Sequence, residues 1–368
     1  MEVPYNPPPS FWLIAAHAGA GLHPPDTHAP VRKTLRTALS AVEHLTSSDS
    51  RIDSLSVTAR ILSELEAAEP LNAGYGSNLT LSGTVECDAA LMDASDGAFG
   101  AVGALCGVRS PVLAARAVLD AWRTRMDDPL DRVMPLTLVG EGARSFAKDR
   151  GVEICEPSSL VSTRALQDWR FWKEKWENMK EEETDQLNSL RKTLRAQQDT
   201  VGAIVLDSTY NMTAGVSSGG LLLKAPGRVG EAAIYGAGCW ADDRIACSIT
   251  GQGELIIRSS VAKMIAEAVE NSPGEDDMHD ILKHVLIDKF YKKWKAYGEP
   301  QPDIGVLVLR KQFDSTKARL WCAFTTPSMA IGYATTEHPK PKAVILKNLT
   351  HTYEDSNRPP FFITGISP

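Results

Sequence analysis

DTVGAIVLD, residues 199–207, is the part of this sequence that decides the predicted fold. Its apolar run, Val201 to Leu206, has the length and composition of a buried β-strand, and a highly charged segment stands directly before it. Thr200 is therefore expected to be the first residue of a strand. If the bond before Thr200 were cut, this residue would carry both a hydroxyl and a free α-amino group, which supply a nucleophile and a base.

A second apolar run, Met212 to Ser217, follows a polar turn centred near residues 209 and 210. Antiparallel pairing of the two runs places Thr200 opposite residues 218 and 219. The hydroxyl of Ser218 would then lie beside the nucleophile, where it could orient the amine or relay a proton. The alternative is that Ser218 merely stands at the end of a strand, and the spacing alone does not choose between the two.

Two further segments could complete a site around Thr200. The sequence TGQG, residues 250–253, is predicted to end a strand and begin a helix, so its backbone N–H groups would converge on one point and suit an oxyanion. Arg228 and Glu231 stand three residues apart in a glycine-rich loop, and a guanidinium is well shaped to bind a carboxylate. Taken alone, the first segment is more simply a glycine turn and the second a surface salt bridge. Together, the segments describe a self-cleaving threonine hydrolase with an acidic substrate group held by Arg228.

An Asp-Thr dipeptide is a weak signal by itself, because the chain contains a second one at Asp26-Thr27. That pair runs into His28-Ala29-Pro30, which is expected to be a loop, whereas Asp199-Thr200 opens a buried strand. The context of the dipeptide, rather than the dipeptide, selects residues 199 and 200.

The composition limits the class of protein. The chain has 368 residues, of which 43% are hydrophobic and 23% charged, as in soluble globular proteins. Its formal net charge of −7 argues against direct binding of nucleic acid, which needs clustered Lys and Arg. The six cysteines are scattered without a C-x-x-C pair, so neither a zinc site nor a disulfide framework is indicated. We expect no metal and no cofactor.

Targeting signals are not evident in the sequence. The N-terminus, MEVPYNPPP, lacks the basic region and the apolar core of a signal peptide, and no run of 18 apolar residues is present. We therefore expect no membrane association and a location in the cytoplasm or nucleus.

The other elements are predicted from periodicity and turn residues. A strand over 11–16 runs into HAGAG, residues 17–21, which we interpret as a tight glycine turn lining a site, because Pro24 stands where a dinucleotide fingerprint needs its third glycine. A glycine loop and short strands are expected over 71–93. A long amphipathic helix is expected within 158–198, where Trp169, Trp172 and Trp176 recur at helical spacing. Further helices are predicted over 31–45, 53–67, 111–124, 140–148, 254–270 and 278–294, and further strands over 304–310, 319–325, 330–334 and 342–346.

Several longer motifs resemble the plant-type asparaginases, a family of N-terminal-nucleophile hydrolases, and within it most closely the threonine aspartases, or taspases. In chain order, the motifs are HAGAG (17–21), NAG (72–74), GSNL (76–79), ECD (86–88), DTVG (199–202), SSGG (217–220), PGRVG (226–230) and GAGCW (236–240). They span about residues 11–254. Because several motifs occur in the same order as in that family, the resemblance is far more specific than any single motif.

The resemblance implies an α/β fold, a four-layer αββα sandwich, with residues 1–368 as a single domain. It further implies a precursor that cuts itself between Asp199 and Thr200. The α subunit would be 1–199, with 158–199 as a mobile helical processing segment, and the β subunit would be 200–368. We expect a homodimer of such αβ units.

The resemblance also implies roles for individual residues. Thr200 would be the nucleophile in self-cleavage and in substrate hydrolysis, and Ser218 stands where the asparaginases have a supporting threonine. Thr250 and Gly251 match the oxyanion hole of that family, and Asn72 matches a site asparagine. Arg228 matches the arginine that binds a substrate carboxylate, and Gly253 matches a glycine that helps to bind a free substrate amine.

The taspase resemblance implies a threonine endopeptidase that cuts protein substrates after aspartate, with Arg228 binding the side chain of that aspartate. The alternative is an asparaginase or isoaspartyl dipeptidase that acts on small amino-acid substrates. Glu231 is a departure, because the asparaginases carry Asp there to bind a free substrate amine, which an internal peptide bond lacks. Ser218, residues 221–223 and Cys239-Trp240 favour the endopeptidase. A scaffold that presents its Trp-rich helix to a partner is the alternative from another class, and an intact chain of 40.0 kDa would support it.

Overall fold

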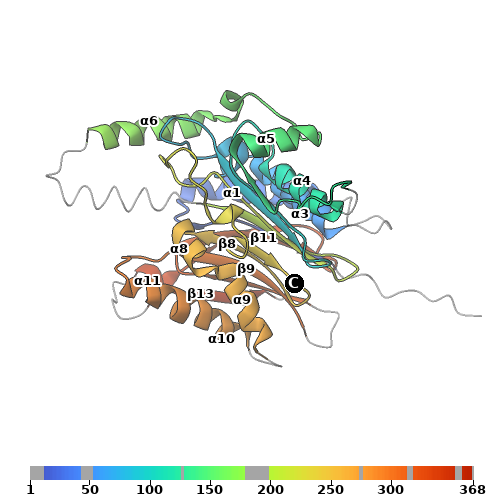
Figure 1. The fold of residues 1–368 in the computed structure, drawn as a ribbon. Helices are drawn as coiled ribbons and strands as arrows, with labels where there is room; N and C mark the ends of the chain where they lie inside the picture. The colour runs from blue at the N-terminus through green and yellow to red at the C-terminus, as the bar shows by residue number, and fades with distance from the viewer. Residues whose placement is uncertain are drawn as a thin grey trace, which may run out of the picture.

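Two β-sheets stacked face to face form the middle of the molecule, and helices cover both outer faces (Figure 1). The computed structural model describes residues 12–42, 53–125, 128–178, 199–272, 277–312, 318–352 and 359–366. This order of layers, helix, sheet, sheet, helix, confirms the predicted αββα sandwich.

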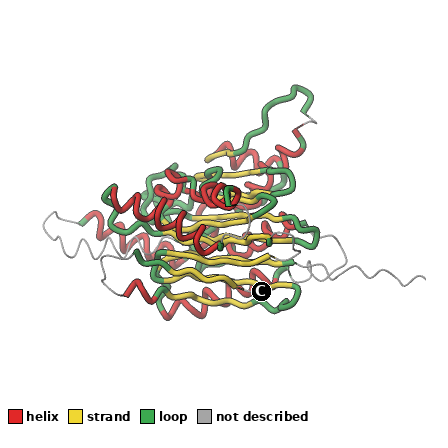
Figure 2. The backbone as a smooth tube through the Cα atoms, turned by 90° about the horizontal axis from the view of Figure 1, so that it is seen from below, coloured by secondary structure: helices red, strands yellow, loops and turns green. Residues whose placement is uncertain are grey.

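Within the described residues, the larger sheet has eight strands in the order β12-β11-β1-β5-β6-β2-β3-β4, and the smaller has five in the order β13-β10-β9-β8-β7. Figure 2 shows the strands running side by side. The strands are β1 (Leu13–Gly21), β2 (Cys87–Asp93), β3 (Phe99–Leu105), β4 (Thr137–Val139), β5 (Val201–Leu206), β6 (Met212–Ser218), β7 (Cys239–Ala241), β8 (Ile245–Gly251), β9 (Ile304–Lys311), β10 (Ala318–Phe324), β11 (Ser328–Thr335), β12 (Lys342–Lys347) and β13 (Phe362–Ile366).

The helices divide between the two outer layers. Those from the first half are α1 (His28–Ser40), α3 (Ser54–Glu66), α4 (Pro111–Arg123), α5 (Gly140–Asp149) and α6 (Thr163–Glu177), with short turns η1 (Pro25–Thr27), η2 (Gly74–Gly76) and η4 (Pro157–Leu160). Those from the second half are α8 (Gly253–Ser259), α9 (Val261–Glu270), α10 (Met278–Lys283), the π-helical η6 (His284–Tyr291) and α11 (Lys292–Ala296), with the turns η5 (Glu231–Ala233) and η7 (Leu349–Thr352).

The central strands are buried on both faces, and their side chains alternate between two cores. In β5, Ala203 packs with the helices of the first half, whereas Ile204 packs between the two sheets. A third core lies between the smaller sheet and the helices that cover it, α9 to α11. Burial on both faces explains why residues 201–206 read as a continuous apolar run rather than an alternating one.

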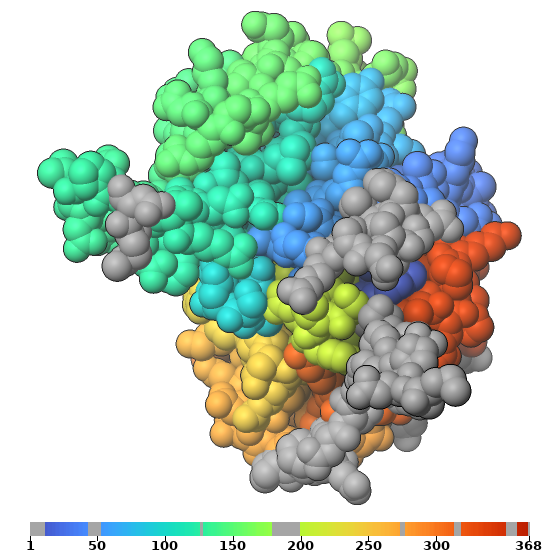
Figure 3. All heavy atoms as spheres, turned by 90° about the vertical axis from the view of Figure 1, so that its right-hand side faces the viewer, coloured from blue at the N-terminus to red at the C-terminus, as the bar shows by residue number. Residues whose placement is uncertain are grey.

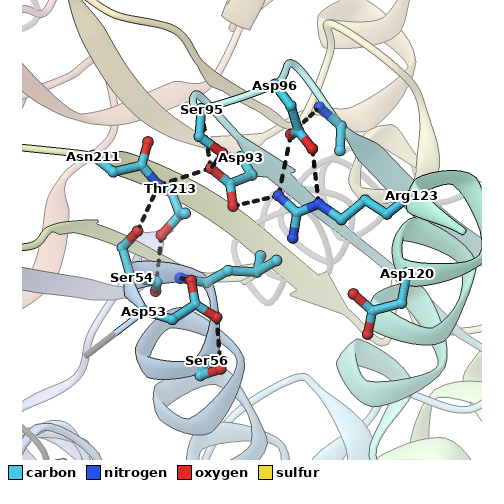
Figure 4. A network of polar contacts seen from close by, with 12 residues as sticks. Asp53, Ser54, Ser56, Asp93, Ser95, Asp96, Asp120, Arg123, Asn211 and Thr213 are labelled. Carbon is cyan, nitrogen blue, oxygen red and sulfur yellow. Dashed lines mark hydrogen bonds and ion pairs between the residues drawn. The ribbon is translucent and has the colours of Figure 1, made fainter. Parts of the chain in front are cut away.

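The predicted hairpin of β5 and β6 is confirmed, including its register. Val201 pairs with Ser217, so Thr200, one residue earlier, lies opposite Ser218. At the other end of the hairpin, Asn211 donates hydrogen bonds to Asp93 Oδ1 at 2.8 Å and to Ser54 Oγ at 3.0 Å (Figure 4). This turn reaches the surface on the face shown in Figure 3. These hydrogen bonds tie the turn to α3 and β2, while pairing with β1 and β2 holds the two strands along their length.

Four details of the sequence prediction are corrected. The helix expected over 254–270 is divided, because Ser260 has φ 49°, a left-handed conformation that interrupts helical hydrogen bonding. Asp26-Thr27 belongs to η1 and leads into α1, which starts at His28 rather than residue 31 and ends at Ser40 rather than near residue 45. HAGAG is not a turn but part of β1, with a register shift between His17 and Ala20. In the segment 158–198, α6 ends at Glu177, and residues 179–198 lie outside the described part.

Among the helices of the described residues, none combines the length and apolarity that a membrane span needs.

Candidate active site

Thr200 lies directly before β5 and is almost fully buried, with 3% of its surface exposed. Its Oγ1 lies 2.8 Å from Glu231 Oε1 and 3.2 Å from Ser218 Oγ. One hydroxyl proton cannot serve both acceptors. Since Ser218 Oγ also accepts from the N–H of Gly220 at 3.0 Å, Ser218 can donate its own proton to Thr200 while Thr200 donates to Glu231.

The carbonyl group of Asp199, which precedes Thr200, is held by the side chain of Asn72. Asn72 Nδ2 donates to Asp199 O at 2.8 Å and to Gly220 O at 2.9 Å. The other end of the amide, Oδ1, accepts from the N–H of Asn78 at 2.9 Å. Because both ends of the amide are hydrogen-bonded, its orientation is fixed, and one donor points at the carbonyl that Thr200 would attack.

The side chain of Asp199 points toward β1. A Cβ atom built on Gly19, which has φ 93°, would lie 2.6 Å from Asp199 Cγ, so glycine is required there for both its conformation and its size. Within the described residues, Asp199 Oδ1 has no hydrogen-bond partner. Burial raises the pKa of this carboxyl group, and electrostatic interactions with His23 and Arg164 oppose that effect. In the intact chain, Asp199 is therefore not the carboxylate that Arg228 binds.

Arg228 lies in the loop between β6 and η5. Its Nε donates to Glu254 Oε1 at 2.9 Å, whereas the buried Nη2 has no hydrogen-bond partner in the described part of the chain. Burial alone would lower the pKa of the guanidinium, but the hydrogen bond to Glu254 and the charges of Glu231, Glu254 and Asp88 raise it. A charged group with a free donor is thus aimed at the cavity.

Glu231 begins η5 and is also buried, with 3% of its surface exposed. Burial raises the pKa of its carboxyl group, while the charge of Arg228 and the hydrogen bond from Thr200 lower it. Oε1 contacts Thr200, and a Cβ atom at Gly253 would crowd Glu231 Oε2 and would lie 2.7 Å from Arg228 Nη2. A glycine at position 253 therefore keeps both charged groups accessible.

The loop that carries Arg228 and Glu231 is anchored on β2. Asp88 Oδ2 accepts from the N–H of Gly230 at 2.8 Å, and Asp88 Oδ1 accepts from the N–H of Ala104 at 2.8 Å. The side chain of Glu86 accepts from the N–H of Gly227 at 2.7 Å. Asp88 of β2 and Glu86, which directly precedes that strand, thus hold the loop on both sides of Arg228.

These groups surround one small cavity where the ends of β5, β6 and β8 meet. Nearly all the residues proposed from the sequence take part in its lining, which consists of Asn72, Asp199, Thr200, Ser218, Gly220, Leu221, Arg228, Glu231, Gly251 and Gly253. Thr250 is the proposed site residue that does not line it. Thr250 is fully buried, and its Oγ1 accepts from the N–H of Ala20 at 3.5 Å.

The sequence did not assign roles to several neighbours of this cavity. Gly19 and His17 belong to the HAGAG motif, and Asp88 belongs to the ECD motif. The motifs therefore indicated which segments lie near the site, but not which contacts their side chains make. His17 Nε2 lies 2.8 Å from Ser248 Oγ, and burial lowers the pKa of the imidazole to about 3, so the ring is neutral. Arg164 carried no sequence signal beyond its place in a charged helix.

Comparisons with known proteins place these features in one family. The family described as asparaginase matches residues 10–336. The chain is similar to a probable isoaspartyl peptidase/L-asparaginase 2 of Arabidopsis thaliana, with 29% identity over 88% of this chain and 96% of the relative. It is 32% identical to an isoaspartyl peptidase of Salmonella typhimurium, over 75% and 84% of the two chains. It is 34% identical to a plant-type L-asparaginase of Thermococcus kodakarensis, over 70% and 79%.

Proposed function

The chain belongs to the asparaginase family of N-terminal-nucleophile hydrolases, and we propose that it is a threonine hydrolase that cuts its own Asp199–Thr200 bond and then hydrolyses β-aspartyl amide bonds. The observation that carries the threonine hydrolase and its self-cleavage is the contact of Thr200 Oγ1 with Glu231 at 2.8 Å, combined with the hydrogen bond from Asn72 to the Asp199 carbonyl at 2.8 Å. A nucleophile, a proton acceptor and a donor to the reacting carbonyl thus occur together.

Self-cleavage begins while Thr200 N is still part of a peptide bond and cannot act as a base. Thr200 Oγ1 attacks the carbonyl carbon of Asp199 and gives its proton to Glu231 Oε1. Charge that develops on the carbonyl oxygen is stabilised by Asn72 Nδ2. The C–N bond then breaks as the nitrogen takes up a proton, which leaves an ester between Asp199 and Thr200 Oγ1. Water hydrolyses this ester to give the carboxylate of Asp199 and the free hydroxyl and amine of Thr200.

Substrate hydrolysis uses the amine that self-cleavage frees. An α-amino group has a reference pKa of about 7.7–8.0, so a useful fraction is neutral near pH 7 and can accept the proton of the Thr200 hydroxyl. In a β-aspartyl substrate, the α-carboxylate would bind Arg228 Nη2 and the α-amine would bind Glu231, which places the β-carbonyl at Thr200. The names of the relatives, isoaspartyl peptidase and L-asparaginase, support this substrate class.

The second candidate is the endopeptidase that cuts proteins after aspartate. The observation that favours it is the engagement of Glu231 by Thr200, because a carboxylate reserved for a substrate amine would not need to contact the nucleophile. In addition, the residue before Thr200 in this chain is itself an aspartate. Here Arg228 Nη2 would bind the side chain of the substrate aspartate.

One comparison tests both candidates. We would first determine the N-terminal residues of the purified fragments, and Thr200 should be one of them. The matured protein would then be given β-aspartyl dipeptides, L-asparagine and a peptide with an internal Asp-Gly bond. The proposal requires a higher kcat/KM for the β-aspartyl dipeptides, whereas a higher value for the internal Asp-Gly bond would identify the endopeptidase. An intact, folded chain without hydrolysis would contradict both.

A further inference from the structure

The loop that carries Asn72 connects α3 to the strand-like residues around Leu79. Its backbone is crowded, because a Cβ atom on Gly76 would collide with the carbonyl oxygens of Ala68, Glu69 and Leu71. Carbonyl oxygens that gather in this way repel one another unless a donor or a cation lies among them. Such a group would therefore determine the position of the loop.

Arg164, in the first turn of α6, supplies that group. Its Nη2 donates to Gly76 O at 2.7 Å and to Glu69 O at 3.0 Å, and its Nε donates to Glu69 O at 3.3 Å. Glu69 and Gly76 lie on either side of Asn72 in the sequence. One guanidinium thus ties together both ends of the loop that presents Asn72 to the scissile carbonyl.

Helix α6 is itself fixed to the body of the protein, so it can serve as a support. Ser162 caps its N-terminus by accepting from the N–H of Ala165 at 3.1 Å, and Trp172 is buried. Trp169 Nε1 donates to Thr80 O at 2.8 Å, and the indole ring packs over Gly83. These contacts hold α6 against the segment that follows the Asn72 loop.

We infer that Arg164 is a positioning residue, which holds the Asn72 loop so that Asn72 Nδ2 reaches the carbonyl oxygen of the bond to be cut. The inference rests on the proposed function, since the reaction at Thr200 is the one that Asn72 serves. It assigns α6 a role in the active enzyme, beyond that of a link to the cleavage point. Lysine cannot replace arginine fully, because a single ammonium group lacks the planar fork that spans Glu69 and Gly76.

The test compares Arg164→Met with Arg170→Met, a control on the exposed face of the same helix. A misplacement of about 1 Å can cost about 100-fold in rate, so Arg164→Met should slow self-cleavage and lower the kcat of matured protein by about 10- to 100-fold. KM should change less than about threefold, because Arg164 does not touch the substrate-binding groups. Arg170→Met should match the wild type in both reactions.

A double-mutant cycle shows whether Arg164 acts through Asn72. If it does, Arg164→Met should have no further effect on the slow rate of Asn72→Ala, whereas independent roles would multiply the two losses. Added guanidinium ion should partly restore Arg164→Ala, and ammonium ion should not. If Arg164→Met does not fold, the rates of Arg164→Lys and the rescue of Arg164→Ala by guanidinium ion test the positioning role of Arg164.

The results separate this inference from the proposed function. A wild-type chain that does not form fragments at Thr200 overturns the proposed function. A wild-type chain that cleaves itself, together with a folded Arg164→Met variant of equal rate, overturns only the role of Arg164. If the rate losses of Arg164→Met and Asn72→Ala multiply in the double variant, the role of Arg164 is also overturned, since Arg164 would then act independently of Asn72.

Discussion

Glu231 Oε1 lies 2.8 Å from Thr200 Oγ1 in a chain whose Asp199–Thr200 bond is still intact. At this stage the nitrogen of Thr200 is an amide, so the base that the matured enzyme would use does not yet exist. A buried carboxylate in contact with the hydroxyl can fill that role for the first reaction. The two reactions of one threonine would then use two different bases.

Glu231→Gln should separate the two reactions. The amide keeps the size of the side chain and an oxygen near Thr200 but does not accept a proton, so self-cleavage should slow by about 100-fold. In the wild type, the rate of self-cleavage should rise with pH as Glu231 ionises, and the rise should lie above the usual pH range of a carboxylic acid, because burial raises its pKa. A time course of fragment formation after refolding at several pH values measures both effects. Equal rates and equal pH profiles for wild type and variant would remove Glu231 from this role.

Thr200→Ala should abolish self-cleavage and hydrolysis together, because the attacking hydroxyl is lost. Thr200→Ser keeps the hydroxyl and should retain a slow reaction. Electrophoresis followed by N-terminal sequencing distinguishes the outcomes. Fragments that begin at residue 200 in the alanine variant would point to another nucleophile.

Arg228→Lys should weaken the binding of substrates that carry a carboxylate. Hydrogen bonds to charged groups contribute about 1.5–3 kcal/mol, so KM for a β-aspartyl dipeptide should rise by about 10- to 100-fold. Arg258→Lys is the matched control, because Arg258 lies in α8, the helix whose Glu254 accepts a hydrogen bond from Arg228, but packs on Trp294, 4.2 Å from the ring centre. An unchanged kcat/KM for Arg228→Lys would assign carboxylate binding to another group.

Much of the fold could be predicted from the sequence, because the central strands are continuous apolar runs. The run 201–206 is apolar without interruption, and the paired run 212–217 set the register that brings Thr200 opposite Ser218. Local geometry was harder to predict. The break at Ser260 depends on a left-handed residue in an otherwise helical pattern, and nothing in the periodicity marks it.

For the candidate site, too, the residues could be predicted from the sequence but their local geometry could not. Motifs and spacing predicted Thr200, Ser218, Arg228 and Gly253, and these residues line one cavity. The orientation of side chains was not predictable, since Asp199 faces Gly19 and Thr250 faces Ala20 only because β1 lies between β5 and β11. The role of Arg164 was not predicted. Its partners are backbone carbonyl oxygens of a loop about 90 positions earlier, and the pattern of side chains in a sequence does not reveal backbone acceptors.

Glu66 should make stability depend on pH. It is fully buried, where its carboxyl group accepts from Ser217 Oγ at 2.7 Å and from the N–H of Val112 at 2.9 Å, and burial raises its pKa to about 7. Between about pH 4.5 and pH 7, the folded state keeps a proton that the unfolded state has lost, so stability should fall as the pH rises. The difference corresponds to about 3 kcal/mol above pH 7.

Urea unfolding at pH 5 and pH 8 measures this effect, and Glu66→Gln provides the comparison. Glutamine resembles the protonated acid in having one acceptor and one donor group, so the variant should lose most of the pH dependence. A dependence equal to that of the wild type would show that other groups cause it.

Gly19→Ala should slow self-cleavage more than its effect on stability explains. The new methyl group would displace Asp199, since a Cβ atom at position 19 lies 2.6 Å from Asp199 Cγ, and a shift of about 1 Å at the scissile bond can cost about 100-fold in rate. Gly97→Ala is the control: Gly97 also has a positive φ, 67°, but a Cβ atom there meets nothing within 4 Å. Both variants should lose about 1–2 kcal/mol of stability from the left-handed backbone, which urea unfolding measures. Only Gly19→Ala should delay fragment formation, and equal rates for the two variants would mean that the close approach of Asp199 to β1 has no part in the reaction.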